Sequence, residues 1–153
     1  MARRFVSTRR LVLAALVAGL LAGCQNMGGG MAMESKKSLY DRLGGQPAIV
    51  AVVDDFVGNV AADNRINGFF ARTDIPRLKR LLAEQICAGT GGPCTYTGRD
   101  MRTTHRGMNI TDAQFNALVE DLVKSLDKFN VPAQEKGELL GILGPLKPQI
   151  VGQ

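Results

Sequence analysis

The sequence has one histidine, His105, and three cysteines among its 153 residues, and these are its main candidates for metal or nucleophilic chemistry. One histidine cannot supply a two-histidine zinc site or the HExxH pair of a metalloprotease. Three cysteines cannot form a four-cysteine metal site. The chemistry open to His105 is therefore that of a single metal ligand or a single acid or base.

The residues around His105 favour the role of a metal ligand. Met101 precedes it by four residues, so both face the same side of a short helix expected over 100–106. Apolar residues follow at Ile110, Phe115 and Leu118. A neutral imidazole that faces an apolar cavity suits an axial ligand of haem iron, whereas acid–base catalysis needs an orienting carboxylate. The alternative is a hydrogen-bonded structural or surface histidine.

The positive charge of the chain is concentrated at its beginning. The formal net charge is +5, from 19 basic and 14 acidic side chains. Four of the arginines precede Leu11 and no acidic residue precedes Glu34, so the chain after residue 23 keeps 15 basic residues and a net charge of +1. Nucleic-acid binding needs a basic surface, which a nearly neutral domain does not predict. We therefore expect no nucleic-acid partner.

Residues 1–23 have the three parts of an export signal: a basic start, an apolar run over 11–21 and two small residues. The run is shorter than the roughly 20 residues that span a bilayer. The junction Leu21-Ala22-Gly23-Cys24 resembles the lipobox of bacterial lipoproteins. This resemblance implies cleavage before Cys24 and attachment of fatty acyl chains, such as palmitate, to that residue. An ordinary signal peptide or an uncleaved anchor with an incidental cysteine is the alternative.

The lipobox implies a protein anchored to a membrane on the extracytoplasmic side. Gln25 is not the aspartate that retains lipoproteins of enteric bacteria in the inner membrane, so the resemblance favours the outer membrane where the cell has one. Residues 24–37 are rich in Gly and Met and are predicted to be a flexible tether. The folded domain is expected over 38–153.

From Ser38 onward, apolar residues recur at three- and four-residue spacing, which predicts an all-α domain. A short helix is expected from Ser38 to Asp41 and is stopped by a pair of glycines. Asp74, and Thr111 or Asn109, are expected to cap later helices. The longer helices are predicted over 47–62, 75–88, 111–130 and 132–151, with a loop over 89–98.

Several motifs of this domain resemble those of group I truncated haemoglobins, the 2-over-2 globins. They are SLYDRLGG over 38–45, DNRINGFF over 63–70, GGP over 91–93, YTG over 96–98 and RGM over 106–108. The motifs occur in order, with family-like spacing, over 38–151. The resemblance implies a globin-like fold in which two antiparallel helix pairs enclose haem b.

The resemblance also implies a role for each matching residue. His105 is expected to be the proximal iron ligand, and Phe70 is expected to pack on the haem face. The other expected pocket residues are Phe56, Val57, Leu78, Leu81, Leu82, Tyr96, Met101, Ile110, Phe115 and Leu118. The expected ligand is a diatomic gas, which is O2, NO or CO. A haem redox enzyme with an electron-transfer partner, and a haem-free structural lipoprotein, are the alternatives.

The distal side departs from the family pattern. Many members have a tyrosine and a glutamine that hydrogen-bond dioxygen, and the matching residues here are Val57 and Leu82. Without such a donor we expect a five-coordinate ferrous iron, fast dioxygen release and comparatively strong CO or NO binding. Slow release would indicate a donor not recognised by the family pattern, such as Gln85 or Tyr40.

Two further features near the expected pocket are left open by the sequence. The haem propionates have several candidate partners, each of which is also explained as a solvated surface residue: Arg77, Lys79, Arg102, Arg106 and Tyr96. Cys87 and Cys94 form a disulfide if the domain is exported to an oxidising compartment. Two free thiols are the alternative.

Overall fold

The computed structural model of the protein describes residues 36–153, which form six α-helices and two 3₁₀ helices. The predicted signal peptide, Cys24 and most of the predicted tether lie outside the described residues. The elements are α1 (Leu39–Arg42), α2 (Gly45–Ala62), η1 (Asn67–Phe70), α3 (Ile75–Gly89), α4 (Met101–His105), α5 (Asp112–Lys128), α6 (Ala133–Leu143) and η2 (Gly144–Gln149). The described residues contain no strand, so the predicted all-α fold is confirmed.

Side chains cap the helices where the sequence predicts their starts. The Asp74 carboxylate accepts a hydrogen bond from the backbone N–H of Arg77 (3.1 Å) at the start of α3. At α5 the hydroxyl of Thr111 accepts from the N–H of Gln114, whose side chain accepts from the N–H of Thr111. These bonds satisfy backbone donors that have no partner within the helix.

Two helix boundaries differ from the predictions. Helix α2 begins at Gly45 rather than at Pro47, after a turn in which Gly44 (φ 94°) and Gly45 (φ 71°) both adopt left-handed conformations that glycine reaches without strain. The helix predicted over 132–151 is two elements, α6 and η2. Pro145 and Pro148 explain this break, because proline has no N–H to donate and its ring clashes with the preceding helical turn.

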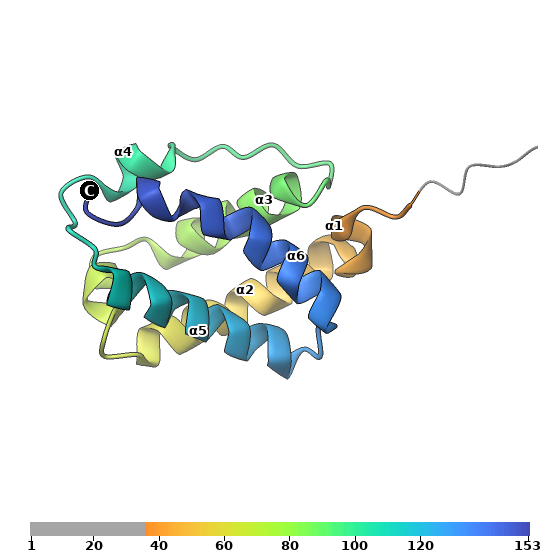
Figure 1. Ribbon diagram of the computed structural model, residues 1–153, viewed down its shortest axis with the longest axis horizontal. Helices are drawn as coiled ribbons and strands as arrows, with labels where there is room; N and C mark the ends of the chain where they lie inside the picture. The colour runs from red at the N-terminus through yellow and green to blue at the C-terminus, as the bar shows by residue number, and fades with distance from the viewer. Residues whose placement is uncertain (1–35) are drawn as a thin grey trace, which may run out of the picture. The chain divides into compact units, whose positions relative to one another are not determined.

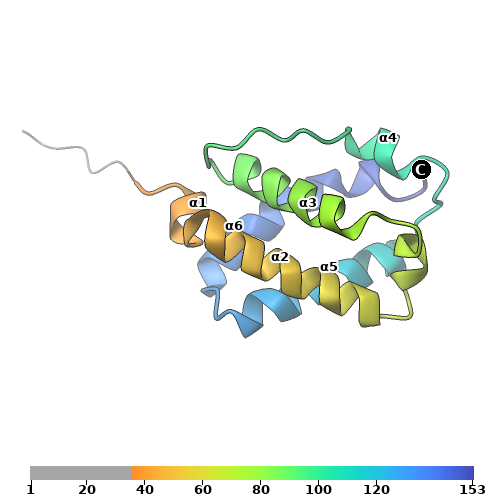
Figure 2. The same ribbon diagram turned by 180° about the vertical axis from the view of Figure 1, so that it is seen from behind.

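The helices form two antiparallel pairs, α2 with α3 and α5 with the α6–η2 segment (Figure 1). Helix α2 contacts both α3 and α5 and therefore joins the pairs. Helix α1 lies at one end of this arrangement and α4 at the other, in both views (Figure 2). The 3₁₀ helix η2 contacts α4.

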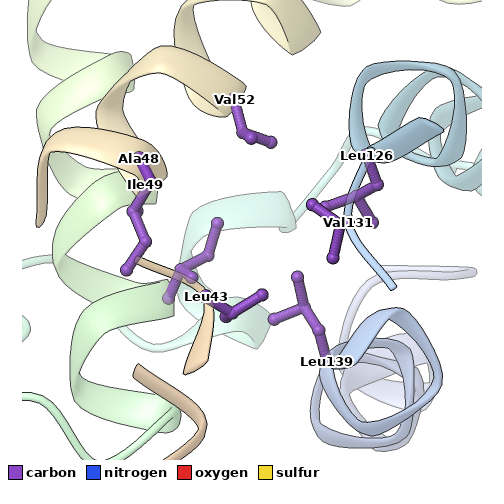
Figure 3. A pocket seen from close by; sticks show the side chains of 8 residues that line it. Leu43, Ala48, Ile49, Val52, Leu126, Val131 and Leu139 are labelled. Atoms are coloured by element: carbon purple, nitrogen blue, oxygen red, sulfur yellow. The ribbon is translucent and has the colours of Figure 1, made fainter. Parts of the chain in front are cut away.

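The core lies between the two pairs and is mostly aliphatic. Helix α2 contributes its whole inward stripe, which is Ile49, Val52, Val53, Phe56, Val57 and Val60. Near α1 the packing leaves a small gap of about 20 Å³, between the side chains shown in Figure 3. Leu43, Val131 and Leu139 are among its lining residues. A water in this gap would have few polar partners, so the gap is expected to be dry.

A polar network crosses the interface between α2 and α5. The side-chain amide of Asn59 donates to the Ser125 hydroxyl (2.9 Å), which donates to the Asp55 carboxylate (2.9 Å). Lys128 also donates to Asp55, and these two bonds lower the pKa of its carboxyl group. Ser125 is fully buried, so its hydroxyl needs these partners.

No helix within residues 36–153 combines the length and the apolar character needed to cross a membrane.

Candidate functional site

A cavity of about 300 Å³ lies at the α4 end of the domain, between the two helix pairs. Its walls come from η1 and the turn after it, α3, α4, α5 and the end of η2. The lining is mainly apolar and consists of Ile66, Phe69, Phe70, Thr73, Leu78, Arg99, Thr104, His105, Met108, Ile110, Gln114, Phe115, Leu118 and Ile150.

His105, which is half-buried, is the last residue of the five-residue helix α4 and lines this cavity. Its ring Nδ1 lies 2.7 Å from the carbonyl oxygen of Met101. A carbonyl oxygen only accepts hydrogen bonds, so Nδ1 donates, and in the neutral ring the lone pair is then on Nε2. This is the tautomer that a metal-ligating histidine requires, and it is fixed by a backbone group rather than by a carboxylate.

Helix α4 is held in place at its start by Asp100. The Asp100 carboxylate accepts a hydrogen bond from the N–H of Thr103 (2.8 Å). Hydrogen bonding by Thr103 lowers the pKa of this carboxyl group, which therefore stays ionised as a cap. The cap fixes the first turn of a helix that is too short to be stable alone.

The chain after α4 is held by the last described residues. The N–H of Asn109 donates to the carbonyl of Gln153 (2.8 Å), and the N–H of Gly152 donates to the carbonyl of Ile110 (3.0 Å). The Arg102 guanidinium donates to the side-chain oxygen of Gln153 (3.1 Å). Residues 151–153 thus tie the segment that follows His105 to the end of η2.

The loop before α4 is tied to α3 in two places. Cys87, which is fully buried in α3, forms a disulfide with Cys94, with their Cα atoms 5.7 Å apart. Further along, Glu84 accepts hydrogen bonds from the Thr97 hydroxyl (2.6 Å) and N–H (3.0 Å). The Thr97 bonds are the main cause of the lowered pKa of Glu84. The loop therefore reaches α4 along a fixed path.

The structure brings several of the predicted pocket residues together around the cavity. These are His105, Phe70, Leu78, Ile110, Phe115 and Leu118. Other predicted residues do not line it. Phe56 and Val57 are buried in the core, Leu82 packs against that core, and Leu81 is half-buried on α3. Tyr96 and Met101 lie in the chain leading to His105, where the Tyr96 hydroxyl donates to the carbonyl of Arg99 (2.9 Å).

Several lining residues were not predicted from the sequence. Phe69 is next to the predicted Phe70, and Thr104 and Met108 flank His105, so adjacency in sequence was the available signal. Ile150 had no such signal, because only the path of η2 brings it to the cavity. Arg99 lines the cavity in place of the predicted propionate partners Arg77, Lys79, Arg102, Arg106 and Tyr96, which are not among the lining residues.

The two polar residues considered as overlooked distal donors do not line the cavity. The Tyr40 hydroxyl accepts a hydrogen bond from the N–H of Gln46 (3.0 Å), at the α1 end of the domain. The Gln85 amide donates to the sulfur of Met101 (3.5 Å). The side chain that α3 presents to the cavity is Leu78, which carries no hydrogen-bond donor.

The cavity fits a haem in its chemistry. A porphyrin needs apolar walls for its faces, one nitrogen ligand for the iron and polar or cationic groups for its propionates. Phe70, Leu118 and their neighbours would supply the walls, Nε2 of His105 would supply the ligand, and Arg99 and Thr104 would supply the polar edge. An all-α fold of two antiparallel helix pairs with this site defines the class of haem-binding globins.

The comparison with known families identifies the family. The model of the family described as "Bacterial-like globin" matches residues 38–151, and the chain belongs to this family. Its relatives include a group 1 truncated hemoglobin of Mycolicibacterium paratuberculosis, 40% identical over 74% of this chain and 83% of the relative. Another, from Nostoc sp., is 32% identical over 76% of this chain and 98% of the relative.

Solved structures of truncated hemoglobins have the same fold. The protein of Tetrahymena pyriformis in its Fe(III) form has a TM-score of 0.74 and 29% identity, covering 76% of this chain and 100% of that one. The 2/2 hemoglobin of Synechococcus sp., in the cyanomet state with covalently attached heme, has a TM-score of 0.67 and 36% identity, covering 71% and 91%. The predicted 2-over-2 globin fold is therefore confirmed, and haem b is the cofactor of this chain.

Proposed function

We propose that this truncated globin reversibly binds a diatomic gas at a five-coordinate haem iron whose only protein ligand is His105. The observation that carries the proposal is the hydrogen bond from Nδ1 to the Met101 carbonyl, which leaves Nε2 free. When bound, the haem supplies an iron with one open position for the gas. The chain would supply the Nε2 ligand of His105 and the mainly apolar side chains that line the cavity.

The apolar distal side determines which gases are retained. Dioxygen is polarised on binding, and a hydrogen bond to such a group contributes about 1.5–3 kcal/mol. Leu78 cannot donate one, and Val57 and Leu82 stand where many relatives have donors. Because 1.4 kcal/mol is a factor of ten, dioxygen should dissociate about ten to a hundred times faster than from a site with a donor. CO and NO depend less on a donor and should bind comparatively strongly.

The ligand role of His105 is tested by absorption spectroscopy of the purified protein. His105→Ala should abolish the Soret spectrum of a histidine-ligated haem. His105→Gly supplemented with imidazole should restore that spectrum, which a merely structural role would not allow. Asn116→Ala, at an exposed position of α5, is the matched control and should leave the spectrum unchanged. A Soret spectrum of the alanine variant identical to that of the wild type would refute the proposal.

The second part of the proposal is that Cys24 carries the acyl chains of a lipoprotein. The support for this is the lipobox-like junction Leu21-Ala22-Gly23-Cys24 after a basic and apolar leader. Several acyl chains anchor firmly, because each buried methylene contributes about 0.8 kcal/mol. The intact mass of the membrane-extracted protein should correspond to a chain that begins at Cys24 with its lipid. A Cys24→Ala variant that keeps the same membrane fraction would contradict the anchor.

A haem redox function is the second candidate. It requires a partner that returns electrons to the iron, because each turnover oxidises it. The residues that line the cavity include no carboxylate and no imidazole besides His105 to assist bond cleavage. The observation that favours it is a group of exposed arginines on the segments that border the cavity: Arg72, Arg77, Arg99, Arg102 and Arg106.

A further inference from the structure

Most cationic side chains within residues 36–153 fall into two groups, and Lys36 and Lys37, before α1, belong to neither. Eight of them form ion pairs with carboxylates: Arg42, Arg65, Lys79, Arg80, Lys124, Lys128, Lys136 and Lys147. Five arginines have no carboxylate partner within residues 36–153, and we call them the arginine rim: Arg72, Arg77, Arg99, Arg102 and Arg106. All five are exposed.

The arginine rim lies on the two segments that border the cavity of His105. Arg99 lines the cavity itself, and Arg102 and Arg106 belong to α4 and its end. Arg72 and Arg77 flank Thr73 and Leu78, which line the same cavity from the side of α3. Apart from Lys36 and Lys37, the cationic side chains without an ion pair in residues 36–153 therefore all lie on the segments that border this cavity.

The acidic residues nearest in sequence do not cancel this charge. Asp74 and Asp100 are the caps of α3 and α4, and their carboxylates accept hydrogen bonds from backbone N–H groups. Arg106 lies near enough to Asp100 to help lower the pKa of that carboxyl group, but the two do not form an ion pair. The two haem propionates can balance the charge of two of these guanidinium groups. The other three guanidinium groups then have no negative partner.

We infer that the arginine rim is a docking surface for an acidic one-electron carrier protein, which would reduce ferric haem held in the cavity of His105. In this step the carrier loses one electron and ferric iron becomes ferrous. The inference rests on the proposed haem function and deepens it. Charge complementarity carries it, because opposite charge around a redox site raises the rate of encounter. Helix α4, which carries Arg102, lies at the opposite end of the domain from α1 (Figure 1).

The first experiment measures the charge at the haem edge without the natural partner. The ferric protein is mixed with [Fe(EDTA)]²⁻ or with [Ru(NH₃)₆]²⁺, each a one-electron reductant, and the Soret change is followed by stopped flow. The variant R72Q/R102Q/R106Q keeps Arg99 in the cavity. The matched control K124Q/K128Q/K136Q removes the same net charge from paired lysines elsewhere.

At low ionic strength the rim variant should react with the anionic reductant about fivefold more slowly than the wild type, and faster with the cationic one. The control variant should change both rates by less than twofold, and added salt should remove the differences. Equal effects in the two variants, or parallel losses with both reductants, would overturn the docking surface. The haem content of each variant, read from its absorption, normalises the rates.

The second experiment does not require haem. An acidic plant-type [2Fe–2S] ferredoxin is titrated into the isotope-labelled protein, and amide shifts are recorded by NMR. Shifts confined to 70–77 and 99–106, and abolished in R72Q/R102Q/R106Q, support the inference. Shifts elsewhere, or stronger association with phosphatidylglycerol vesicles than with the ferredoxin, overturn it. Absence of a Soret spectrum refutes the haem function instead, so the two failures are distinguishable.

Discussion

Leu78 is the residue through which α3 meets the cavity, and it offers no hydrogen-bond donor to the proposed gas ligand. Leu78→Gln would place an amide donor there with little change in volume. A hydrogen bond of about 1.5–3 kcal/mol should slow dioxygen dissociation about ten- to a hundredfold. Flash photolysis and stopped-flow mixing would measure the rate, with Leu78→Met as the apolar control. An unchanged rate in the glutamine variant would mean that another group already holds the gas.

Asp63 is the residue whose protonation is most clearly linked to stability. Its carboxylate receives hydrogen bonds from the side chain and N–H of Arg65, which lower its pKa to about 2. A carboxyl group with a lowered folded-state pKa stabilises the fold above its ordinary pKa of about 3.9 and loses this contribution as the pH falls to about 2. Asp63→Asn should therefore destabilise the protein at neutral pH and flatten the loss of stability between pH 4 and 2.

The measurement for Asp63 is urea unfolding followed by circular dichroism at several pH values. Asp112→Asn is the matched control, because its exposed carboxylate pairs with Lys147 across the surface. If the control and Asp63→Asn had the same pH profile, the turn after α2 would not depend on the Asp63–Arg65 bonds.

Among the elements, the loop between α3 and α4 depends on the Cys87–Cys94 disulfide. Closing so short a ring reduces the freedom of the unfolded chain and should contribute about 2–3 kcal/mol. Cys87→Ala/Cys94→Ala should lower the melting temperature, and a thiol reductant should have a similar effect on the wild type but none on the variant. A reductant-insensitive wild type with two free thiols by mass would show that the bridge is not formed.

The sequence was most informative where an element begins with a short-range signal. Asp74, Thr111 and the glycines after α1 could be recognised because a cap or a left-handed turn involves only a few neighbouring residues. Pro145 was visible in the sequence, but the continuing apolar pattern concealed the break between α6 and η2. Spacing identified the apolar face of a helix but not the part of that face that meets the cavity.

In the candidate site, too, residues with a local signal were predictable and residues placed by the tertiary fold were not. His105 and the aromatic and aliphatic residues around it were predicted from type, spacing and resemblance, and the structure places many of them on one cavity. Ile150 could not be predicted from local sequence, because it lies far from His105 in the chain and only the tertiary fold brings it to the cavity. Likewise, the exclusion of Val57 from the cavity lining follows from how tightly α2 packs between α3 and α5.

At the scale of the whole molecule, the last residues close the site. Residues 151–153 bond to Asn109, Ile110 and Arg102, and Ile150 lines the cavity. Removal of 150–153 should therefore speed haem loss about tenfold or more. The truncated chain would lose one residue of the cavity lining and the hydrogen bonds that hold the segment around α4. Transfer of haem to excess apomyoglobin measures this rate. Gln134→Ala, on the exposed side of α6, is the control. Equal rates in all three proteins would show that the last residues do not hold the haem.

The hydrogen bond between the His105 ring and the Met101 carbonyl has a consequence for how the protein can evolve. Many metal-binding histidines are oriented by a side chain, which a single substitution can delete. Here the acceptor belongs to the peptide backbone one turn earlier, and every amino acid at position 101 provides it. The hydrogen bond that orients the imidazole is therefore retained whichever side chain occupies position 101.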